Sequence, residues 1–384
     1  MSEALTALSR FSLSLSQRFG SIALILLLVG GCGQGAKNTP ANGVQRDVAD
    51  VVRIGFGSCA DDDAPNHKVW DALVASNPDV LLMVGDNVYA DSEEFKANPS
   101  VATMQREYAK LAATPGFAEL RATRPVIATW DDHDFGINDG GAAFSFKTES
   151  AEIFKDFWNY PADDPARMRP GIYTERRINR NGIDIQVLLL DTRTFRGPLE
   201  DASRSLSCPL KNYVLNTQDT FLGEAQWTWL AEQLAKPADL RLLVSGQQVI
   251  ADEHCFEKWG NFPHERLRLF QTLRHAEATN VIVISGDRHL GEISKLPADA
   301  VDGAGFDLFE VTSSPLSARS GFGWGEKNSY RVSEDNLRES QFGLLDISRS
   351  GELIRVQMGL HDAQGNPRFV QVAEFGSNAG SLAP

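Results

Sequence analysis

The chain has 384 residues and a formal net charge of −14, with acidic residues outnumbering basic ones. This charge argues against a protein that binds nucleic acid non-specifically, because such a protein needs a basic face. The length suits one large domain or two ordinary ones, each able to bury a sizeable hydrophobic core.

The first segment, Met1–Gly31, has the organisation of a secretory signal. Two arginines precede Ile22–Val29, an apolar run that is far shorter than the about 20 residues of a membrane-spanning helix. Small residues stand directly before Cys32, which resembles a bacterial lipobox. The resemblance implies cleavage before Cys32 and lipidation of its sulfur. An ordinary signal peptide, or a short anchor with an incidental cysteine, is the alternative.

Residues 32–50 are rich in glycine, asparagine and alanine, which predicts a flexible tether. Gly33 rather than an aspartate follows Cys32, and by resemblance to Gram-negative sorting signals this favours the outer membrane. We therefore expect an exported protein, anchored to the outer membrane through a lipid on Cys32 and facing the periplasm. Residues 51–384 are expected to form its folded domain.

From residue 51 onward, short β-branched runs alternate with segments that carry an apolar stripe at helical spacing. The pattern predicts strands over Val51–Phe56, Val80–Val84, Val126–Trp130, Leu240–Val244 and Val281–Ile284. It predicts helices over Lys68–Ala75, Val101–Leu111, Thr148–Phe157, Gly223–Leu234 and Glu265–Ala276. The pair Asn181-Gly182 predicts a hairpin turn between two further strands, Ile172–Ile178 and Ile183–Leu190.

The last quarter of the chain contains only strand patterns, with Gly351 and Gly365 at the turns between them. These strands are expected over Phe306–Val311, Gly343–Ile347, Glu352–Met358 and Arg368–Phe375. The order of elements predicts a mixed sheet with helices outside it and an antiparallel sheet behind it.

Three polar motifs directly follow predicted strands: Gly85–Tyr89, Trp130–Asp134 and Gly286–His289. Ligands of open α/β sheets bind at the carboxyl ends of the strands, so these motifs are expected to meet at one edge. Carboxylates suit hard cations, and a tyrosine phenolate can bind ferric iron. Each motif alone could be a polar turn. Together they indicate a pair of metal ions that promotes hydrolysis of a phosphate ester.

The motif Asp131-Asp132-His133-Asp134 surrounds a histidine with three carboxylates, which repel one another unless a positive charge lies between them. A metal ion would supply that charge, and a helix N-terminus would supply part of it. His133 would then act as a general acid. In the third motif, Asp287 and His289 would share one side of an extended segment, with Arg288 facing away.

The chain has four cysteines. An oxidising compartment would permit a disulfide between Cys208 and Cys255. Cys59 then remains, at the end of the first predicted strand. A lone cysteine there is usually a small buried hydrophobic residue, but at this edge it is also a candidate thiolate ligand.

Five motifs in order resemble the alkaline phosphatase D family, a branch of the calcineurin-like metallophosphatases: Phe56–Ala60, Gly85–Tyr89, Trp130–Asp134, Leu190–Arg193 and Gly286–His289. The resemblance implies a sandwich of two mixed β-sheets flanked by helices, of mixed α/β class, with metals at the sheet edge. It further implies hydrolysis of phosphate monoesters or diesters with Fe³⁺ and Ca²⁺, although other divalent metals remain open.

Carried over residue by residue, the resemblance implies a set of metal ligands, in which Asp86 bridges the two ions: Cys59, Asp86, Tyr89, Asp132, Asp287 and His289. His133 stands where the wider superfamily has its general acid. That superfamily places a histidine after the strand that corresponds to Leu240–Val244, where this chain has Gln247 and Gln248. Gln247 is therefore a candidate carbonyl ligand for calcium.

Arg193 could hold the substrate phosphate with two parallel hydrogen bonds, or it could form a structural ion pair with Asp191 or a neighbour. Two cations would lower the pKa of a bridging water, and the resulting hydroxide would attack phosphorus while His133 protonates the leaving group.

The sequence thus predicts an exported metallophosphatase acting on a small phosphate ester or on a lipid or polymer. A diesterase of phospholipase type is the alternative within this class. A lipoprotein that only binds phosphate or a partner is the alternative outside it.

Overall fold

The computed structural model describes residues 50–61, 68–320 and 326–376. Within these ranges, no helix has the length and apolar character needed to cross a membrane. The chain divides after Gln45, and all the described elements belong to the unit Arg46–Pro384. The predicted signal, the tether and Cys32 lie outside the described residues, so export, lipidation and the domain boundaries stay predictions.

Two six-stranded sheets form this unit. The first has the order β12-β11-β10-β1-β2-β3, with β1 (Val52–Gly57), β2 (Val80–Val84), β3 (Val126–Thr129), β10 (Gln341–Ser350), β11 (Leu353–Asp362) and β12 (Pro367–Gly376). The second has the order β4-β5-β6-β7-β9-β8, with β4 (Thr174–Arg180), β5 (Ile183–Leu189), β6 (Leu240–Ser245), β7 (Val281–Ser285), β8 (Gly291–Leu296) and β9 (Leu308–Ser313). Each sheet contains both parallel and antiparallel pairs.

The prediction of a separate antiparallel sheet is wrong. Strands β10, β11 and β12 pair with one another, but β10 also pairs antiparallel with β1, so they extend the first sheet. Strand β9 lies in the second sheet, parallel to β7. Alternating polarity identifies a strand but not its neighbour, because the partner is chosen by tertiary packing. The implied sandwich of two mixed sheets is confirmed.

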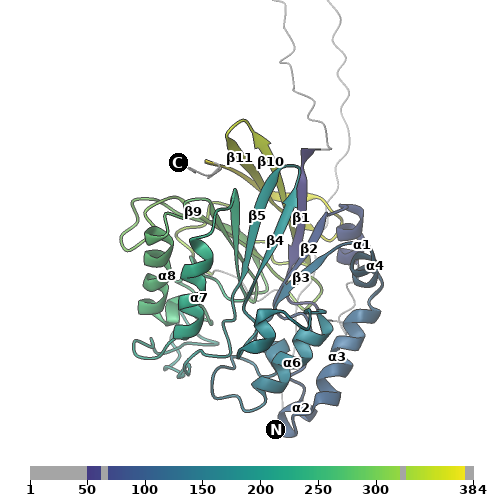
Figure 1. Ribbon diagram of the computed structural model, residues 1–384. Helices are drawn as coiled ribbons and strands as arrows, with labels where there is room; N and C mark the ends of the chain where they lie inside the picture. The colour runs from purple at the N-terminus through teal and green to yellow at the C-terminus, as the bar shows by residue number, and fades with distance from the viewer. Residues whose placement is uncertain (1–49, 62–67, 321–325, 377–384) are drawn as a thin grey trace, which may run out of the picture. The chain divides into compact units, whose positions relative to one another are not determined.

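Helices cover the outer faces of both sheets (Figure 1). The helices α1 (Lys68–Ala75), α3 (Val101–Ala113), α4 (Pro115–Thr123) and α6 (Lys147–Phe157) belong to the first sheet's side, and α7 (Glu224–Leu234) and α8 (Pro263–His275) to the second's. Sequence analysis missed β8, α4 and the short elements α2 (Glu93–Ala97), α5 (Asp132–Phe135), η2 (Pro165–Met168) and η3 (Trp259–Asn261).

The side chains of each strand alternate in direction, and this explains why both sheets contact each other on one face and helices on the other face. In β2, Leu82 packs between the two sheets whereas Leu81 and Met83 pack against the helices outside. In β6, Leu242 faces the inside and Leu243 faces α7 and α8. Successive side chains of a strand point to opposite faces, so a strand buried on both faces reads as a continuous apolar run.

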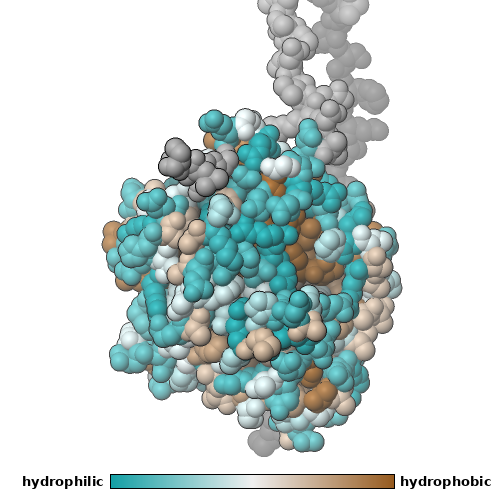
Figure 2. Space-filling view, viewed as in Figure 1, coloured by the Kyte–Doolittle hydropathy of each residue, from teal (hydrophilic) through white to brown (hydrophobic). Residues whose placement is uncertain are grey.

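The predicted hairpin and disulfide are both confirmed. Asn181 and Gly182 have φ angles of 54° and 71°, which a two-residue hairpin of this type requires. Cys208 and Cys255 form a disulfide, and Cys59 is free and buried. The face with α6 and α7 is largely hydrophilic, with hydrophobic residues in small patches (Figure 2).

Candidate functional site

Strands of both sheets end at one place, and their ends bring four carboxylates together. Asp86 follows β2, Asp131 and Asp132 follow β3, and Asp287 follows β7. One carboxylate oxygen from each lies within 4.8 Å of the others. Asp86 and Asp132 also form a group with His133 at the same spacing. The predicted convergence of separate strand ends on one site therefore exists, and Asp131 joins it.

Unusual backbone conformations turn these side chains toward one another. Cys59, Asp86, Asp287 and His289 have φ angles of 58°, 50°, 64° and 50°, in the left-handed region that few residues other than glycine adopt. Such residues cost of order 1–3 kcal/mol each and gather at functional sites. At Gly85, a Cβ atom would lie 2.6 Å from the Cβ of Asp131, so only glycine allows these loops to approach.

Cys59 and Asp86 form the buried floor of the site. The Cys59 Sγ lies 3.3 Å from Asp86 Oδ2 and accepts a hydrogen bond of 3.0 Å from the Ser314 hydroxyl. Burial raises the pKa of the Cys59 thiol to about 12. Burial, together with the neighbouring Cys59 and Asp132, also raises the pKa of Asp86 well above its usual range. A cation between these groups would reverse both effects.

His133 is placed as a proton donor would be. Its backbone N–H donates to Asp86 Oδ1 at 3.2 Å, and its ring Nδ1 lies 2.7 Å from Asp91 Oδ1. Burial opposes a charge on this ring, but Asp132, Asp86 and Asp91 outweigh it and raise the pKa of His133 to about 11. Sequence analysis missed Asp91, which follows Asp86 closely but belongs to no motif.

Tyr89 and His289, predicted as ligands from different motifs, meet in the structure. The Tyr89 hydroxyl lies 3.2 Å from His289 Nε2, and the Tyr89 ring lies 4.3 Å from the ring of His133. The expectation that Asp287 and His289 share one side of an extended segment is wrong, because both have positive φ angles. Arg288 does not face away either, since it lines one cavity together with Asp287 and His289.

Arg193 and Gln247 support the carboxylates from within the protein. The Arg193 side chain is 0% exposed and pairs with Asp131 at 2.6 Å and with Glu257 at 2.7 Å. The amide of the buried Gln247 contacts Arg193, and in the orientation that satisfies both groups its oxygen accepts from the guanidinium at 3.0 Å. Arg193 therefore forms a structural ion pair, the alternative to a substrate contact, and its partners are Asp131 and Glu257 rather than Asp191. Its substrate contact and the calcium contact of Gln247 stay predictions that this burial does not favour.

A cavity of about 310 Å³ opens over the carboxylates. Four predicted site residues line it, together with Arg288 of the third motif: Asp132, His133, Asp287 and His289. The rest of the lining comes from loops without any motif: Asn138, Asp139, Lys211, Phe256 and Glu257. Asp139 and Glu257 form a further acidic group with Asp132. A cavity of this size can hold a small phosphate ester.

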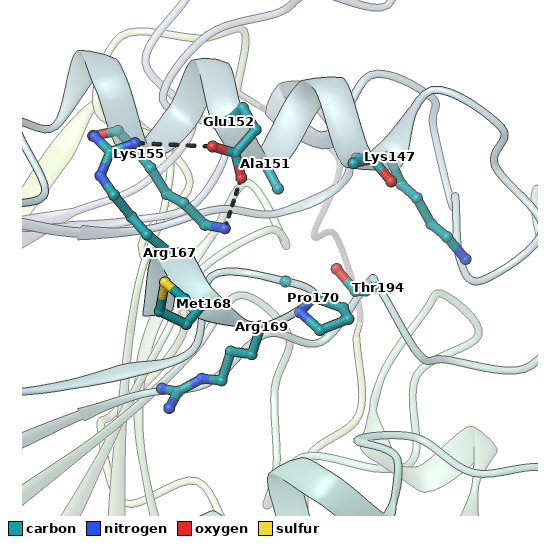
Figure 3. A pocket seen from close by; sticks show the side chains of 11 residues that line it. Lys147, Ala151, Glu152, Lys155, Arg167, Met168, Arg169, Pro170 and Thr194 are labelled. Atoms are coloured by element: carbon teal, nitrogen blue, oxygen red, sulfur yellow. Dashed lines mark hydrogen bonds and ion pairs between the residues drawn. The ribbon is translucent and has the colours of Figure 1, made fainter. Parts of the chain in front are cut away.

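A second cavity, also about 310 Å³, lies between α6 and η2 (Figure 3). Its cations have partners within the protein. Lys155 lies 3.0 Å and Arg167 lies 3.8 Å from Glu152, as the dashed lines show. None of the predicted ligands lines this cavity, so the cavity over the strand ends is the candidate site.

The residues at the strand ends fit a pair of metal ions. Asp131 Oδ2 and Asp132 Oδ1 are buried and accept no hydrogen bond from any of the described residues. Buried carboxylate oxygens almost always have a partner, so these two point to a cation. Carboxylate oxygens suit a hard ion such as calcium, and the nearby thiol, phenol and imidazole add donors suited to iron.

Comparison with known proteins decides the family. The family model described as PhoD-like phosphatase matches residues 54–358, a range that contains all five motifs. The chain belongs to the PhoD-like phosphatase family. The expected resemblance to alkaline phosphatase D is thereby confirmed.

Two relatives of this PhoD-like chain agree with that membership. Alkaline phosphatase D of Bacillus subtilis (strain 168) is 21% identical over 315 residues, which cover 73% of this chain and 51% of that protein. The chain thus spans about half the length of this curated relative. A solved structure of PhoD is 13% identical, has a TM-score of 0.62 and covers 85% of this chain and 70% of its own, which shows a shared fold.

Proposed function

We propose that this PhoD-like protein is a metal-dependent phosphoesterase that hydrolyses phosphate monoesters, diesters or both in the cavity over the strand ends. The main support is the meeting of four carboxylates, three buried and one half-buried, from the ends of β2, β3 and β7, two of them with an oxygen that accepts no hydrogen bond from the described residues. Such a group is costly to bury without cations. When bound, two cations would activate water and neutralise charge on the phosphoryl group.

Side chains of the protein would supply the other roles in the reaction. Asp91 fixes the His133 ring through Nδ1, and His133 would give a proton from Nε2 to the leaving alkoxide. Arg193 holds Asp131 in place and neutralises it. Cys59, Asp86, Tyr89 and Asp287 would hold Fe³⁺, and Asp132 and His289, with Asp86, would help to hold Ca²⁺.

The decisive experiment measures turnover of p-nitrophenyl phosphate and of bis-p-nitrophenyl phosphate before and after chelation. We expect chelation to abolish turnover and added metal to restore it. Asp132→Asn should lower the rate about 100-fold or more even with metal added, since a ligand is lost. The exposed Asp71 provides the matched control, and Asp71→Asn should behave as the wild type. No turnover of either ester by metal-loaded protein would favour a binding protein instead.

The iron assignment has a spectroscopic test. A tyrosinate bound to Fe³⁺ gives the protein a visible charge-transfer band, and Tyr89→Phe should abolish that band. An iron-free, colourless and fully active enzyme would show that other metals do this chemistry.

The role of His133 can be tested through leaving groups. His133→Ala should lower hydrolysis of an alkyl phosphate by about 10²–10⁴-fold, but that of a nitrophenyl ester much less, because nitrophenolate leaves without a proton. His264→Ala, at an exposed histidine of α8, is the control. Equal losses on both esters would remove His133 from the acid role.

We also propose that the protein is exported and held on the outer membrane, facing the periplasm, by a lipid on Cys32. The disulfide between Cys208 and Cys255 supports an oxidising compartment. Labelled palmitate should enter the wild-type protein but not Cys32→Ser. Equal labelling of both would contradict the anchor.

A further inference from the structure

One cation of the cavity over the strand ends has no part in the proposed chemistry. Arg288 lies between Asp287 and His289, and all three residues line that cavity. The left-handed backbone at Asp287 and His289 makes this possible, because it breaks the alternation of an extended strand. The turn that brings two candidate metal ligands into the site therefore also brings Arg288 there.

The Arg288 side chain is held in one position on two sides. Its guanidinium carbon lies 4.0 Å from the centre of the Phe256 ring, and its Nη2 pairs with Glu326. Phe256 directly follows Cys255, which the disulfide joins to Cys208. The Arg288 side chain is only 6% exposed. A guanidinium that is ordered before a ligand arrives loses little conformational entropy when it binds that ligand.

These contacts leave part of the guanidinium without a hydrogen bond. Nη1 donates to none of the described residues, and Asp287 Oδ2 lies 4.0 Å from it, beyond hydrogen-bonding distance. The buried Nε also has no acceptor among them. Lys211, which lines the cavity as well, is 2.8 Å from Asp139 and is thereby neutralised. Of this lysine and this arginine, Arg288 is the one that keeps a donor for an anion in the cavity.

The place of this donor indicates which anion it would bind. Asp287 is one of the four carboxylates that meet at the strand ends, and Nη1 lies 4.0 Å from it. A phosphoryl group bound beside these carboxylates would therefore lie within reach of Arg288. A hydrogen bond from arginine to phosphate is charge-assisted and roughly twice as strong as one between neutral groups.

We propose that Arg288 binds a non-bridging oxygen of the phosphoryl group through Nη1 and thereby favours phosphate monoesters over diesters. In a monoester, the negative charge of the transition state spreads over three oxygens that carry no organic group, whereas in a diester one of the three carries the second organic group. A fixed cation therefore stabilises the monoester reaction more. This preference rests on the proposed phosphoesterase function, whereas the binding of phosphate by Arg288 does not.

A pair of variants separates phosphate binding from a purely structural ion pair. Arg288→Gln removes the cation, but it also leaves the Glu326 side chain, which is 11% exposed, without this partner. The double variant Arg288→Gln and Glu326→Gln removes the unpaired carboxylate as well, so it should regain most of the stability that the single variant loses. Thermal unfolding checks this. Arg274→Gln, at an exposed arginine of α8, is the matched control.

Binding of inorganic phosphate to the metal-loaded protein is a readout that needs no turnover. Isothermal titration calorimetry should give a Kd about 10–100-fold higher for both Arg288 variants than for the wild type, because a charge-assisted hydrogen bond is lost. Arg274→Gln should bind phosphate as the wild type does. Wild-type affinity in the double variant would overturn the proposal, and the role of Arg288 would then be limited to its ion pair with Glu326.

Turnover tests the preference between esters. In the double variant, kcat/KM for p-nitrophenyl phosphate should fall about 10–100-fold, whereas that for bis-p-nitrophenyl phosphate should fall less than about threefold. Equal losses on both esters would contradict the preference for monoesters. If the metal-loaded wild type hydrolyses neither ester, the phosphoesterase function fails, whereas the calorimetric comparison still decides whether Arg288 binds phosphate.

Discussion

At the scale of single residues, the site combines an acidic cluster with one imidazole, His133, whose pKa that cluster raises. Three aspartates act on His133, and they come from the loop after β2 and from the start of α5. Asp91 is the one that touches the ring, at Nδ1. A carboxylate in this position fixes the orientation of the ring and stabilises its protonated form, as in other histidine-carboxylate pairs.

Asp91 is accordingly a positioning residue with a testable effect. Asp91→Asn should lower the rate on alkyl phosphates about tenfold and shift the alkaline limb of the pH–rate profile to lower pH, because the ring then loses its proton more easily. The measurement is kcat/KM against pH. Glu93→Gln, at an exposed residue close by, should leave the profile unchanged. A pH profile that does not move would show that Asp91 is only structural.

At the scale of elements, one buried carboxylate connects α8 to α7 and to the segment before α7. Glu265 accepts hydrogen bonds from the backbone N–H of Phe221 at 2.6 Å and from the Trp227 indole at 2.9 Å. Burial opposes ionisation of Glu265, but these hydrogen bonds outweigh it and lower its pKa. A folded-state pKa below the unfolded value stabilises the protein above the unfolded pKa, and this contribution is lost as the pH falls through the folded pKa.

Glu265→Gln should therefore destabilise the protein by about 1–3 kcal/mol at pH 7, because charge-assisted hydrogen bonds are lost. The difference from wild type should shrink as the pH is lowered below about 4.5, where the unfolded glutamate binds a proton. Urea unfolding at several pH values measures both effects. Glu232→Gln, at an exposed position of α7, should change stability little at any pH. A pH-independent loss would refute the ionic contribution.

At the scale of the whole molecule, a long-range crosslink joins two loops that carry residues of the cavity. The disulfide closes a loop with a sequence separation of 47 between Cys208 and Cys255. Removing a crosslink of this length restores conformational freedom mainly to the unfolded chain.

The double variant Cys208→Ser and Cys255→Ser should be less stable by about 2–4 kcal/mol. Thermal unfolding with and without a reducing agent checks this expectation. Reduction should lower the midpoint of the wild type to that of the variant and leave the variant unchanged. A wild-type midpoint that does not respond to complete reduction would contradict the stabilising role.

The sequence by itself determined most of the strands and helices and the identity of the residues at the strand ends. Apolar periodicity is a local property, so α1 and β2 are predicted to the residue. The motifs around Asp86, Asp132 and Asp287 could be found because each directly follows a buried strand. Together with Cys59 they sufficed to indicate the family.

Tertiary structure alone decided how these parts combine. Strand pairing placed β10 beside β1, and left-handed backbone turned Asp287 and His289 into the site on a segment that is not extended. Arg193 became a buried partner of Asp131 and Glu257. Asp91 reached the His133 ring and Lys211 reached the cavity, both from loops without periodicity. The reason is physical: periodicity depends on neighbours in the chain, whereas contacts between loops depend on packing across the whole fold.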